Sequence, residues 1–358
     1  MKILQLTEHY LPFLGGVEVN THEICKRLVR DGFEVEIICG REKGTIKNEV
    51  IDGVKIHRIL NFRIIKLKYD LGRISPKMLI SALRNDADIV HAHAYGFFPT
   101  YASVFSNKPT LITTHSDPTA KIYPFGDLSR SIPLRLCDHI VATTELEKQH
   151  LIKRGVSSKK ISLIPNGITL PPLNVPKIDY PSKIILCLAR LDTAHKGQDM
   201  LLQAMPKVIS KVPGVKLWIA GDGKDEKMLK DLTKKLKISK NVEFKGPITN
   251  PIKAQLLKNC SVLCIPPRTE SFGIVYLEAM AYGLPIVTTR VGGIPEVVGD
   301  STLLVPPNDP SALANELVHV LSDDKLAEGL RKRSLERVKH FDWEHIVKKY
   351  EDLFERMK

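Results

Sequence analysis

The sequence predicts an α/β protein with two domains, each built on a doubly wound parallel sheet. Short apolar runs alternate with helical patterns along the chain, as they do in successive strand–helix–strand units. The alternation stops at a proline-rich stretch, residues 165–176, and then starts again. The length of 358 residues is also too great for one ordinary hydrophobic core and suits two.

The first half of the chain opens with a predicted strand at residues 3–6, followed by Gly15, Gly16 and a helix over residues 17–31. The later strands predicted here are residues 34–39, 54–59, 89–93, 110–114, 140–143 and 161–164. Helical stretches separate most of these strands. Because helical crossovers join parallel strands, this half is predicted to form one parallel sheet.

The second half repeats the alternation after the predicted linker. Its strands are predicted at residues 183–188, 215–220, 242–244, 262–265, 286–288 and 303–305, and the tail over residues 310–357 is predicted to contain helices only. The predicted domains are residues 1–168 and 177–340. Parallel sheets bind ligands at the carboxyl ends of their strands, so two such domains facing each other across a cleft would both contribute to a site.

The composition is that of a soluble globular protein, with 43% hydrophobic and 6% aromatic residues. No apolar run reaches the roughly 18 residues that span a membrane, and the N-terminus has no signal-peptide pattern, so a cytoplasmic protein is expected. The six cysteines lie mostly within apolar patterns. Only Cys260 and Cys264 are close in sequence, which gives no zinc set and favours reduced, buried thiols.

The formal net charge is +13. An excess of this size fits nucleic acid, an anionic membrane surface or a polyanionic ligand as a partner. The sequence contains no familiar nucleic-acid-binding motif, so no nucleic acid is expected. Residues 62–84 combine basic and apolar side chains, which indicates contact with anionic lipid, although a solvated helix face has the same pattern.

Two carboxylates flank a predicted helix start between the strands at 262–265 and 286–288. Glu270 precedes this helix and Glu278 lies on it. Free backbone N–H groups at the helix start would attract phosphate, and they belong to Ser271, Phe272, Gly273 and Ile274. A carboxylate on each side of a phosphate site suits a ligand with hydroxyl groups at both ends, such as a nucleotide sugar. The alternative is a helix-dipole partner at Glu270 and a surface residue at Glu278.

Cations and glycines follow other predicted strands. Arg190 and Lys196 come after the first strand of the second half, where they would neutralise a diphosphate, although a solvated turn shows the same pattern. Gly221 ends another strand, which fits either close packing or contact with a ligand. Gly15 and Gly16 let the backbone approach a ligand, but they form no dinucleotide-binding fingerprint, and a tight turn is the alternative.

Histidines end two strands of the first half. His115 follows the strand at 110–114 and would point into the cleft, where it can orient a substrate or relay a proton. His93 ends the strand at 89–93 and is a candidate contact for an acceptor substrate. A single histidine is more often structural, and His91 is expected to be so.

Together these residues resemble the retaining glycosyltransferases of family 4, which have the GT-B fold, over nearly the whole chain. The resemblance is carried by Gly15-Gly16, Thr114-His115-Ser116-Asp117, residues 164–168, Arg190 with Lys196-Gly197, residues 219–223, and Glu270 with Glu278. It implies two Rossmann-like domains, the first binding the acceptor and the second the nucleotide-sugar donor. It also implies that the chain crosses between them at Asn166-Gly167 and that a C-terminal helix, at about residues 342–358, packs back on the first domain.

The resemblance implies a role for each site residue. Arg190 and Lys196 would hold the diphosphate and stabilise the departing nucleoside diphosphate. Glu270 would bind the hydroxyls of the transferred sugar, Glu278 the ribose, and His115 would lie by the donor sugar and the acceptor. The expected catalytic residues are His115, Arg190, Lys196 and Glu270; the expected donor contacts are Gly15, Gly16, Arg190, Lys196, Gly221, Glu270, Phe272, Gly273, Ile274 and Glu278; the expected acceptor contacts are His93 and His115.

The implied reaction moves a hexose from a donor of the GDP-mannose, UDP-glucose or UDP-N-acetylglucosamine type to a hydroxyl group of a lipid, glycan or small molecule. The reaction is expected to need no metal and no cofactor, because cationic side chains and a helix dipole would stabilise the leaving diphosphate. Two alternatives stay open, a GT-B sugar phosphorylase and a catalytically silent module that binds sugar nucleotides. Work at the inner membrane face is open as well.

Overall fold

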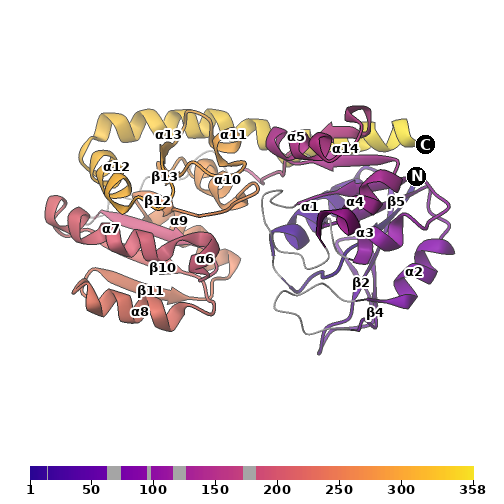
Figure 1. The fold of residues 1–358 in the computed structure, drawn as a ribbon, viewed down its shortest axis with the longest axis horizontal. Helices are drawn as coiled ribbons and strands as arrows, with labels where there is room; N and C mark the ends of the chain where they lie inside the picture. The colour runs from indigo at the N-terminus through magenta and orange to yellow at the C-terminus, as the bar shows by residue number, and fades with distance from the viewer. Residues whose placement is uncertain (14, 63–73, 95–97, 116–125, 172–182) are drawn as a thin grey trace. The chain divides into compact units, whose positions relative to one another are not determined.

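The computed structural model describes residues 1–13, 15–62, 74–94, 98–115, 126–171 and 183–358. The chain divides into two compact units, shown in Figure 1. The first consists of Met1–Gly167 together with Trp343–Lys358, and the second of Ile168–Asp342. Each unit has its own sheet and its own buried hydrophobic residues, which confirms the prediction of an α/β protein with two doubly wound domains.

Within the described residues, the sheet of the first unit has eight strands in the order β3-β4-β2-β1-β5-β6-β7-β8. They are β1 (Lys2–Leu6), β2 (Glu34–Gly40), β3 (Asn48–Ile51), β4 (Val54–Ile59), β5 (Ile89–His93), β6 (Thr110–Thr113), β7 (His139–Ala142) and β8 (Ile161–Leu163). Neighbouring strands run parallel except β3 and β4.

One edge of this sheet departs from the predicted parallel arrangement. Strand β3 pairs antiparallel with β4 through the turn Asp52-Gly53. Both turn residues have positive φ, 50° and 79°, as the hairpin turn that matches the twist of the strands requires. The Asp-Gly pair between two apolar runs is the local signal for this hairpin in the sequence.

Helices cover both faces of the first sheet, so its central strands are buried on both sides. Successive side chains of a strand point to opposite faces. Ile3 of β1 therefore joins a core with α1 and α14, whereas Leu4 and Leu6 join a core with α2, α3, α4 and α5. The helices are α1 (Gly16–Arg30), α2 (Pro76–Leu83), α3 (Phe98–Ser103), α4 (Gly126–Leu136), α5 (Glu145–Lys153) and α14 (Trp343–Met357), with the 3-10 helix η1 (Ser158–Lys160).

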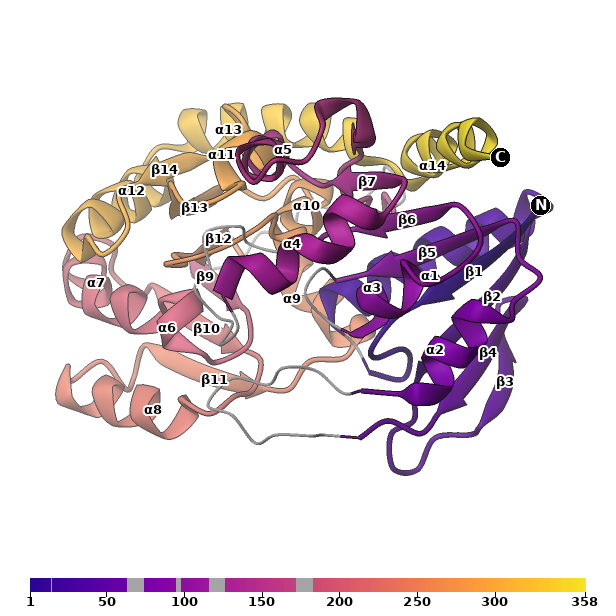
Figure 2. The same cartoon turned by 45° about the vertical axis from the view of Figure 1, so that its right-hand side comes forward.

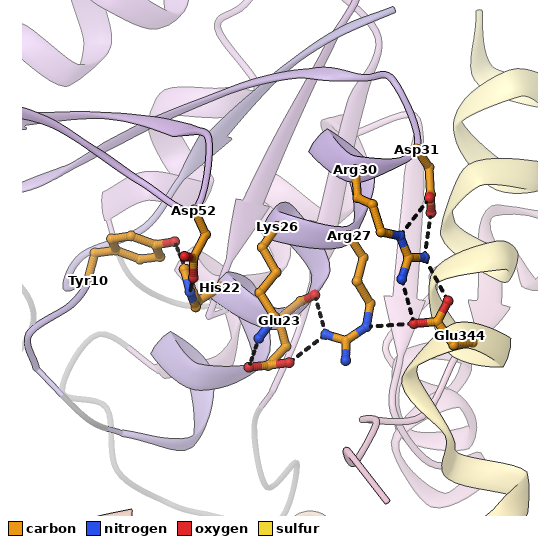
Figure 3. Close-up of polar contacts among 9 residues, drawn as sticks. All are labelled: Tyr10, His22, Glu23, Lys26, Arg27, Arg30, Asp31, Asp52 and Glu344. Atoms are coloured by element: carbon orange, nitrogen blue, oxygen red, sulfur yellow. Dashed lines mark hydrogen bonds and ion pairs between the residues drawn. The ribbon is translucent and has the colours of Figure 1, made fainter.

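Helix α14 belongs to the first unit although it comes last in the sequence. Its Trp343 and Phe354 are buried in the core that α1 shares. Glu344 accepts hydrogen bonds from Arg27 Nε at 3.3 Å and from Arg30 Nη2 at 2.6 Å, as Figure 3 shows. Both chain termini consequently lie on this unit, near each other in Figures 1 and 2.

Within the described residues, the second unit has a six-stranded parallel sheet in the order β11-β10-β9-β12-β13-β14. Its strands are β9 (Ile184–Leu188), β10 (Lys216–Ala220), β11 (Val242–Gly246), β12 (Val262–Ile265), β13 (Ile286–Thr289) and β14 (Leu303–Val305). Its helices are α6 (Thr193–Lys196), α7 (Gln198–Lys211), α8 (Glu226–Lys235), α9 (Asn250–Asn259), α10 (Ile274–Ala281), α11 (Ile294–Val298), α12 (Pro310–Ser322) and α13 (Asp324–Val338), with the 3-10 helix η2 (Lys339–Phe341). Figure 2 shows β11 and α8 at one edge and α12 and α13 toward the other.

The chain passes between the units twice, after Gly167 and after Asp342. In the second unit the two connections lie side by side, because Ile168 forms a parallel bridge with Asp342 and its N–H donates to Phe341 O at 2.8 Å. In the first unit Gly167 lies so close to the Trp343 indole that a Cβ atom at Gly167 would overlap the ring. Residues 172–176 of the predicted linker lie outside the described residues.

The six cysteines are buried and free, as the sequence predicts. Burial raises the pKa of each of these thiols, for example that of Cys137 to about 12. No helix in the described ranges has both the length and the apolar character needed to cross a bilayer.

Candidate functional site

The strand order of the second unit reverses direction between β9 and β12. Strands β10 and β11 follow on the β9 side, and β13 and β14 follow on the β12 side. Loops that leave such a pair of strands part to opposite faces, and open α/β sheets bind ligands in the crevice between them. The loop after β9 carries Arg190, the short helix α6 that follows it ends with Lys196, and the loop after β12 carries Glu270. Three predicted site residues therefore lie at this switch point.

Lys196 and Glu270 form an ion pair there. Lys196 Nζ lies 2.6 Å from Glu270 Oε2, and the two side chains are 24% and 14% exposed. Helix α6 ends directly after Lys196 at Gly197, which has a left-handed conformation with φ 67°. A Cβ atom at Gly197 would overlap the Pro266 carbonyl, so glycine is needed where the two loops touch. A half-buried cation beside a half-buried carboxylate can bind the phosphate and hydroxyl groups of one ligand.

Arg268, in the loop after β12, makes hydrogen bonds to the segment after β9. The sequence alone does not indicate this role. The Arg268 guanidinium donates to both carboxylate oxygens of Asp199, at 2.8 and 2.9 Å, and to the Thr193 carbonyl at 2.5 Å. The bidentate bond to Asp199 raises the pKa of Arg268. The only signal in the sequence is its position two residues before Glu270, because the partners become apparent only in the folded chain.

The main chain of Glu270 is fixed by the turn after β13. Gly293 N–H donates to Glu270 O at 3.2 Å. Gly292 has φ 52°, and a Cβ atom there would overlap the same carbonyl oxygen. A third strand of the sheet therefore sets the position from which the Glu270 carboxylate reaches Lys196.

Arg190 is the most accessible of the predicted cations, with a side chain that is 69% exposed. Its nearest carboxylate is Asp192, at 3.9 Å from Nη2. Asp192 is itself held by Lys224 at 3.2 Å and by His195 at 3.1 Å. Burial alone would raise the pKa of Asp192, but the hydrogen bonds from these two side chains lower it below its ordinary value. The exposed Arg190 side chain is thus free to reach an anionic ligand that binds beside the Lys196–Glu270 ion pair.

Gly273 is the N-cap residue of α10; it has φ 79°, and a Cβ atom there would overlap the Tyr276 ring. Within the described residues no side chain caps this helix, and the Tyr276 N–H donates to Gly273 O at 2.9 Å. Ser271, Phe272 and Gly273 precede the helix, and a phosphate contact at their N–H groups stays a prediction. The Phe272 side chain is buried and packs edge-on against Phe341, with ring centroids 6.1 Å apart. Only the backbone of Phe272 can face a ligand, and the Ile274 side chain is half-buried.

Glu278 has a partner that the sequence does not reveal. Lys253 of α9 lies with its Nζ 2.5 Å from Glu278 Oε1, and both side chains are half-buried. A carboxylate among apolar neighbours needs such a counter-charge. This lysine–carboxylate pair resembles that of Lys196 and Glu270, but its carboxylate lies on α10, which follows the loop that carries Glu270.

Gly221 has a structural explanation. It follows β10 with φ 130°, and a Cβ atom there would overlap the Ala189 carbonyl of the β9 loop. Gly223 stands in the same relation to the backbone of Leu191. Close packing of two loops therefore accounts for these glycines, and contact between Gly221 and a donor stays a prediction.

Gly15 and Gly16 lie at the start of α1, at the carboxyl end of β1. The carboxylate of Glu18 occupies this helix start, because a Cβ atom at Gly15 would overlap it. Burial raises the pKa of Glu18, and hydrogen bonds from its own N–H and from Gly15 N–H oppose that shift. In this conformation Glu18 takes the N–H group of Gly15, one of the expected donor contacts.

The segment before these glycines is anchored by a row of hydrogen-bonded side chains that runs from buried Tyr10 to exposed Asp52, drawn in Figure 3. The Tyr10 hydroxyl lies 2.7 Å from His22 Nδ1, and His22 Nε2 lies 3.0 Å from Asp52 Oδ2. Arg58, which is also buried, donates to the Leu11 carbonyl. These contacts tie the start of α1 to the edge hairpin β3–β4.

His115 lies at the carboxyl end of β6 with φ 49° and a partly exposed side chain. Its Nε2 is 3.2 Å from His93 Nδ1. Burial lowers the pKa of His115 to about 4, so its imidazole is neutral at pH 7. A neutral ring at a strand end can accept or donate one hydrogen bond to a ligand.

The structure argues against the expected acceptor contact at His93. Its side chain is 0% exposed, and both ring nitrogens face protein atoms, His115 Nε2 and Gln5 Oε1. The strand end suggested an exposed side chain, but helices cover both faces of this sheet. Two other predictions fall partly outside the described residues: the family motif at Ser116-Asp117, and residues 63–73 of the segment expected to contact lipid.

No group of three or more His, Cys, Asp or Glu side chains in the described parts of the chain is arranged to hold a metal ion.

Two family models match the chain. The model described as glycosyltransferase family 4 matches residues 14–170, and the model described as glycosyl transferases group 1 matches residues 174–337.

Two relatives align over almost the whole chain. Phosphatidyl-myo-inositol mannosyltransferase of Mycolicibacterium smegmatis is 27% identical over an alignment of 356 positions, which covers 96% of this chain and 90% of the relative. N-acetyl-alpha-D-glucosaminyl L-malate synthase of Bacillus anthracis is 28% identical over an alignment of 372 positions, which covers 96% of this chain and 94% of the relative.

Solved structures share the same fold. Sucrose-phosphate synthase from Thermosynechococcus elongatus superposes with a TM-score of 0.82 at 23% identity, covering 99% of this chain and 98% of that one. Anabaena HepE in complex with UDP-glucose superposes with a TM-score of 0.79 at 19% identity, covering 99% and 100%. The two-sheet architecture described above is therefore that of these proteins.

Proposed function

Because this chain belongs to the group 1 glycosyltransferases of family 4, we propose that it transfers a hexose from a nucleoside diphosphate sugar to an acceptor hydroxyl. The transfer retains the anomeric configuration and needs no metal ion. The donor is of the GDP-mannose, UDP-glucose or UDP-N-acetylglucosamine type. HepE, which shares the fold, is a protein whose complex with UDP-glucose supports a donor of this class.

The ion pair between Lys196 and Glu270 is the observation that carries the proposal. It lies at the strand switch point of the second unit, where open α/β sheets bind their ligands. A sugar diphosphate brings both complementary groups, an anion for Lys196 and hydroxyls for Glu270. Donor binding would exchange the internal ion pair for these two contacts.

The same cations would act in the chemical step. As the glycosidic bond breaks, negative charge grows on the leaving diphosphate. Lys196 and the exposed Arg190 would stabilise that charge, and fixed cations at such a position are worth several kcal/mol. Glu278 would bind the ribose hydroxyls, with Lys253 remaining as a second positive charge beside the nucleotide. His115 of the first unit would contact a sugar hydroxyl.

The acceptor proposed is an anionic molecule with a hydroxyl group. The names of the two relatives include phosphatidyl-myo-inositol and L-malate, which are both anionic and both carry hydroxyls. A net charge of +13 would favour the approach of such acceptors.

A lipid acceptor would bring the protein to a membrane surface, and helix α2 has a suitable face. Ile80 and Leu83 are 49% and 46% exposed, and the exposed Lys77 and Arg84 flank them. Apolar side chains bordered by cations suit an anionic lipid surface. The double variant Ile80→Ser, Leu83→Ser should lose co-sedimentation with vesicles that contain phosphatidylglycerol. Ile252→Ser, at a similarly exposed residue of the second unit, is the control and should bind like the wild type.

Binding and transfer assays test the catalytic proposal. Thermal shifts with GDP, UDP and inorganic phosphate identify the nucleotide, because ligands that bind the native state raise the melting temperature. The matching nucleotide sugar should then release nucleoside diphosphate in the presence of phosphatidylinositol or malate. Stabilisation by phosphate alone with phosphorolysis of a glycoside would indicate a phosphorylase. Nucleotide binding without hydrolysis or transfer would indicate a binding module, and either result would refute the proposal.

A further inference from the structure

The side-chain rings of His91, His93 and His115 form a row at the carboxyl ends of β5 and β6, each ring next to the following one. His91 and His93, two residues apart on β5, have ring centroids 4.2 Å apart, and those of His93 and His115 are 5.5 Å apart. His91 and His93 are fully buried, whereas His115 is partly exposed. The strand order of the first unit reverses beside β5, between β1 and β5, so this row ends at a ligand-binding type of position.

A chain of hydrogen bonds joins His115 to the interior. His115 Nε2 is 3.2 Å from His93 Nδ1, and His93 Nε2 is 2.8 Å from Gln5 Oε1. Burial lowers the pKa values of His93 and His115, so both rings are neutral at pH 7. A neutral imidazole has one N–H group and one nitrogen lone pair, so each ring must donate at one end and accept at the other.

The polarity of the chain follows from its inner end. The Gln5 amide has its Oε1 toward His93, and its buried Nε2 makes no hydrogen bond among the residues that the structure describes. In this orientation Gln5 Oε1 accepts, so His93 carries its proton on Nε2. Its Nδ1 then accepts from the N–H of His115 Nε2. The remaining lone pair of His115 is on Nδ1, for which the described part of the chain offers no hydrogen-bond partner.

We propose that Gln5 and His93 are positioning residues, which hold His115 in the tautomer protonated on Nε2 and so present Nδ1 as an acceptor for a substrate hydroxyl. The role of Nδ1 rests on the glycosyl transfer proposed above. A hydroxyl that donates to Nδ1 is held with its oxygen at a fixed place, as the transfer of a sugar requires. The other tautomer of His115 would carry an N–H group at Nδ1, and the hydroxyl would then have to accept a hydrogen bond instead of donating one.

His91 provides a matched control because it lies in the row but outside the chain. Its Nε2 is 2.8 Å from Thr113 Oγ1, and it makes no hydrogen bond to His115. His91→Phe and His93→Phe replace equally buried rings of the same strand. Their effects on folding should be similar, and only His93→Phe should affect His115.

Nitrogen NMR of the histidine-labelled free protein tests the tautomer. The wild-type spectrum should show His115 protonated on Nε2 and unprotonated on Nδ1. His93→Phe and Gln5→Leu should produce a mixture of tautomers, while His91→Phe and Gln5→Glu, which keeps an acceptor at residue 5, should retain the wild-type pattern. Protonation of Nδ1 in the wild type, or a pattern that no variant changes, would overturn the proposal.

Kinetics test the substrate role. His93→Phe and Gln5→Leu should lower kcat about 10-fold or more with little change in donor KM, because supporting hydrogen bonds of a site residue have effects of this size. Gln5→Glu should keep most of the wild-type kcat. Equal losses in His91→Phe and His93→Phe, or in Gln5→Leu and Gln5→Glu, would refute a role in positioning.

Donor hydrolysis without an acceptor separates the two sources of the hydroxyl. If the hydroxyl belongs to the donor sugar, the variants lose hydrolysis and transfer alike; if it belongs to the acceptor, they lose transfer alone. A wild-type protein that transfers no sugar would refute the proposed function and the substrate role of Nδ1 together. The NMR spectrum of the free protein would still decide whether Gln5 and His93 set the tautomer.

Discussion

The ammonium group of Lys196 lies 2.6 Å from the carboxylate of Glu270, although 74 residues separate them in the sequence. Lys253 and Glu278 repeat this relationship at 2.5 Å. Each carboxylate assigned to the donor hydroxyls is thus paired with a lysine of the same unit. The second unit holds the charges of its site in balanced pairs, which limits the cost of keeping them half-buried.

Replacement of Lys196 by alanine should lower kcat about 100-fold or more, because a fixed cation that stabilises charge on a leaving group has an effect of this size. Initial rates with a saturating donor measure it. Lys183→Ala is the matched control: Lys183 precedes β9, whereas Lys196 follows it, and its pair with Asp324 is also an ion pair, at 3.4 Å. Equal rates in the two variants would rule out the role of Lys196.

Replacement of Glu278 by glutamine should raise the donor KM and leave kcat nearly unchanged, because ribose contacts persist from the ground state to the transition state. Titration of the nucleoside diphosphate by calorimetry should show the same loss of affinity. Glu226→Gln removes a carboxylate that pairs with Lys230 at 2.6 Å on α8 and serves as the control. A normal donor affinity in Glu278→Gln would contradict the ribose role.

Gly167→Ala should destabilise the protein by about 1–3 kcal/mol, because the added Cβ atom overlaps the Trp343 indole and the buried ring must shift. Thermal unfolding of the purified variant measures the loss. Gly329→Ala provides the comparison within α13, where the nearest atom to an added Cβ is 3.5 Å away. That variant should be slightly stabilised, since alanine favours a helix over glycine.

The attachment of α14 depends on its buried aromatic residues more than on its ion pairs. Phe354→Ala should cost about 3–5 kcal/mol because it removes a fully buried ring. Glu344→Gln removes the exposed contacts to Arg27 and Arg30 and should change the melting temperature only slightly. Comparable losses in the two variants would show that this ranking is wrong.

The stability of the first unit should fall in mild acid. Burial lowers the pKa of His91 to about 3 and that of His115 to about 4, from 6.5 in the unfolded chain. Below pH 6.5 the unfolded state therefore binds protons that the native state does not. Above this pH the free energy of unfolding should have its full value. It should fall by about 1.4 kcal/mol per pH unit for each histidine as the pH drops toward 4. Urea unfolding at several pH values measures the slope, which His91→Phe should reduce.

The strands are largely predictable from the sequence because parallel strands buried on both faces form plain apolar runs. Strand β9 is predicted at 183–188 and observed at Ile184–Leu188. Strand β3 is not predicted, since at the sheet edge its polar and apolar residues mix, and only the Asp52-Gly53 turn reveals it.

The candidate site is predictable in part. Residues at strand ends, such as Lys196 and Glu270, follow from the rule that parallel sheets bind ligands there. Their partners do not, because a hydrogen bond such as that between His93 and Gln5 joins residues 88 positions apart. Burial of His93 has the same origin, since which helices cover a strand end is a property of the folded unit.

The first unit is built from two separate segments of the chain, and this discontinuity affects how the protein folds during synthesis. The second unit is one uninterrupted segment, Ile168–Asp342, whereas the first also needs Trp343–Lys358. A ribosome makes Trp343–Lys358 after all of Ile168–Asp342, so the second unit can complete its core while the first still lacks Trp343 and Phe354. Domains usually mature in the order in which they are translated. Here the later-made domain can mature first, while on one face the first sheet is covered by α1 without α14 until Trp343–Lys358 has been made.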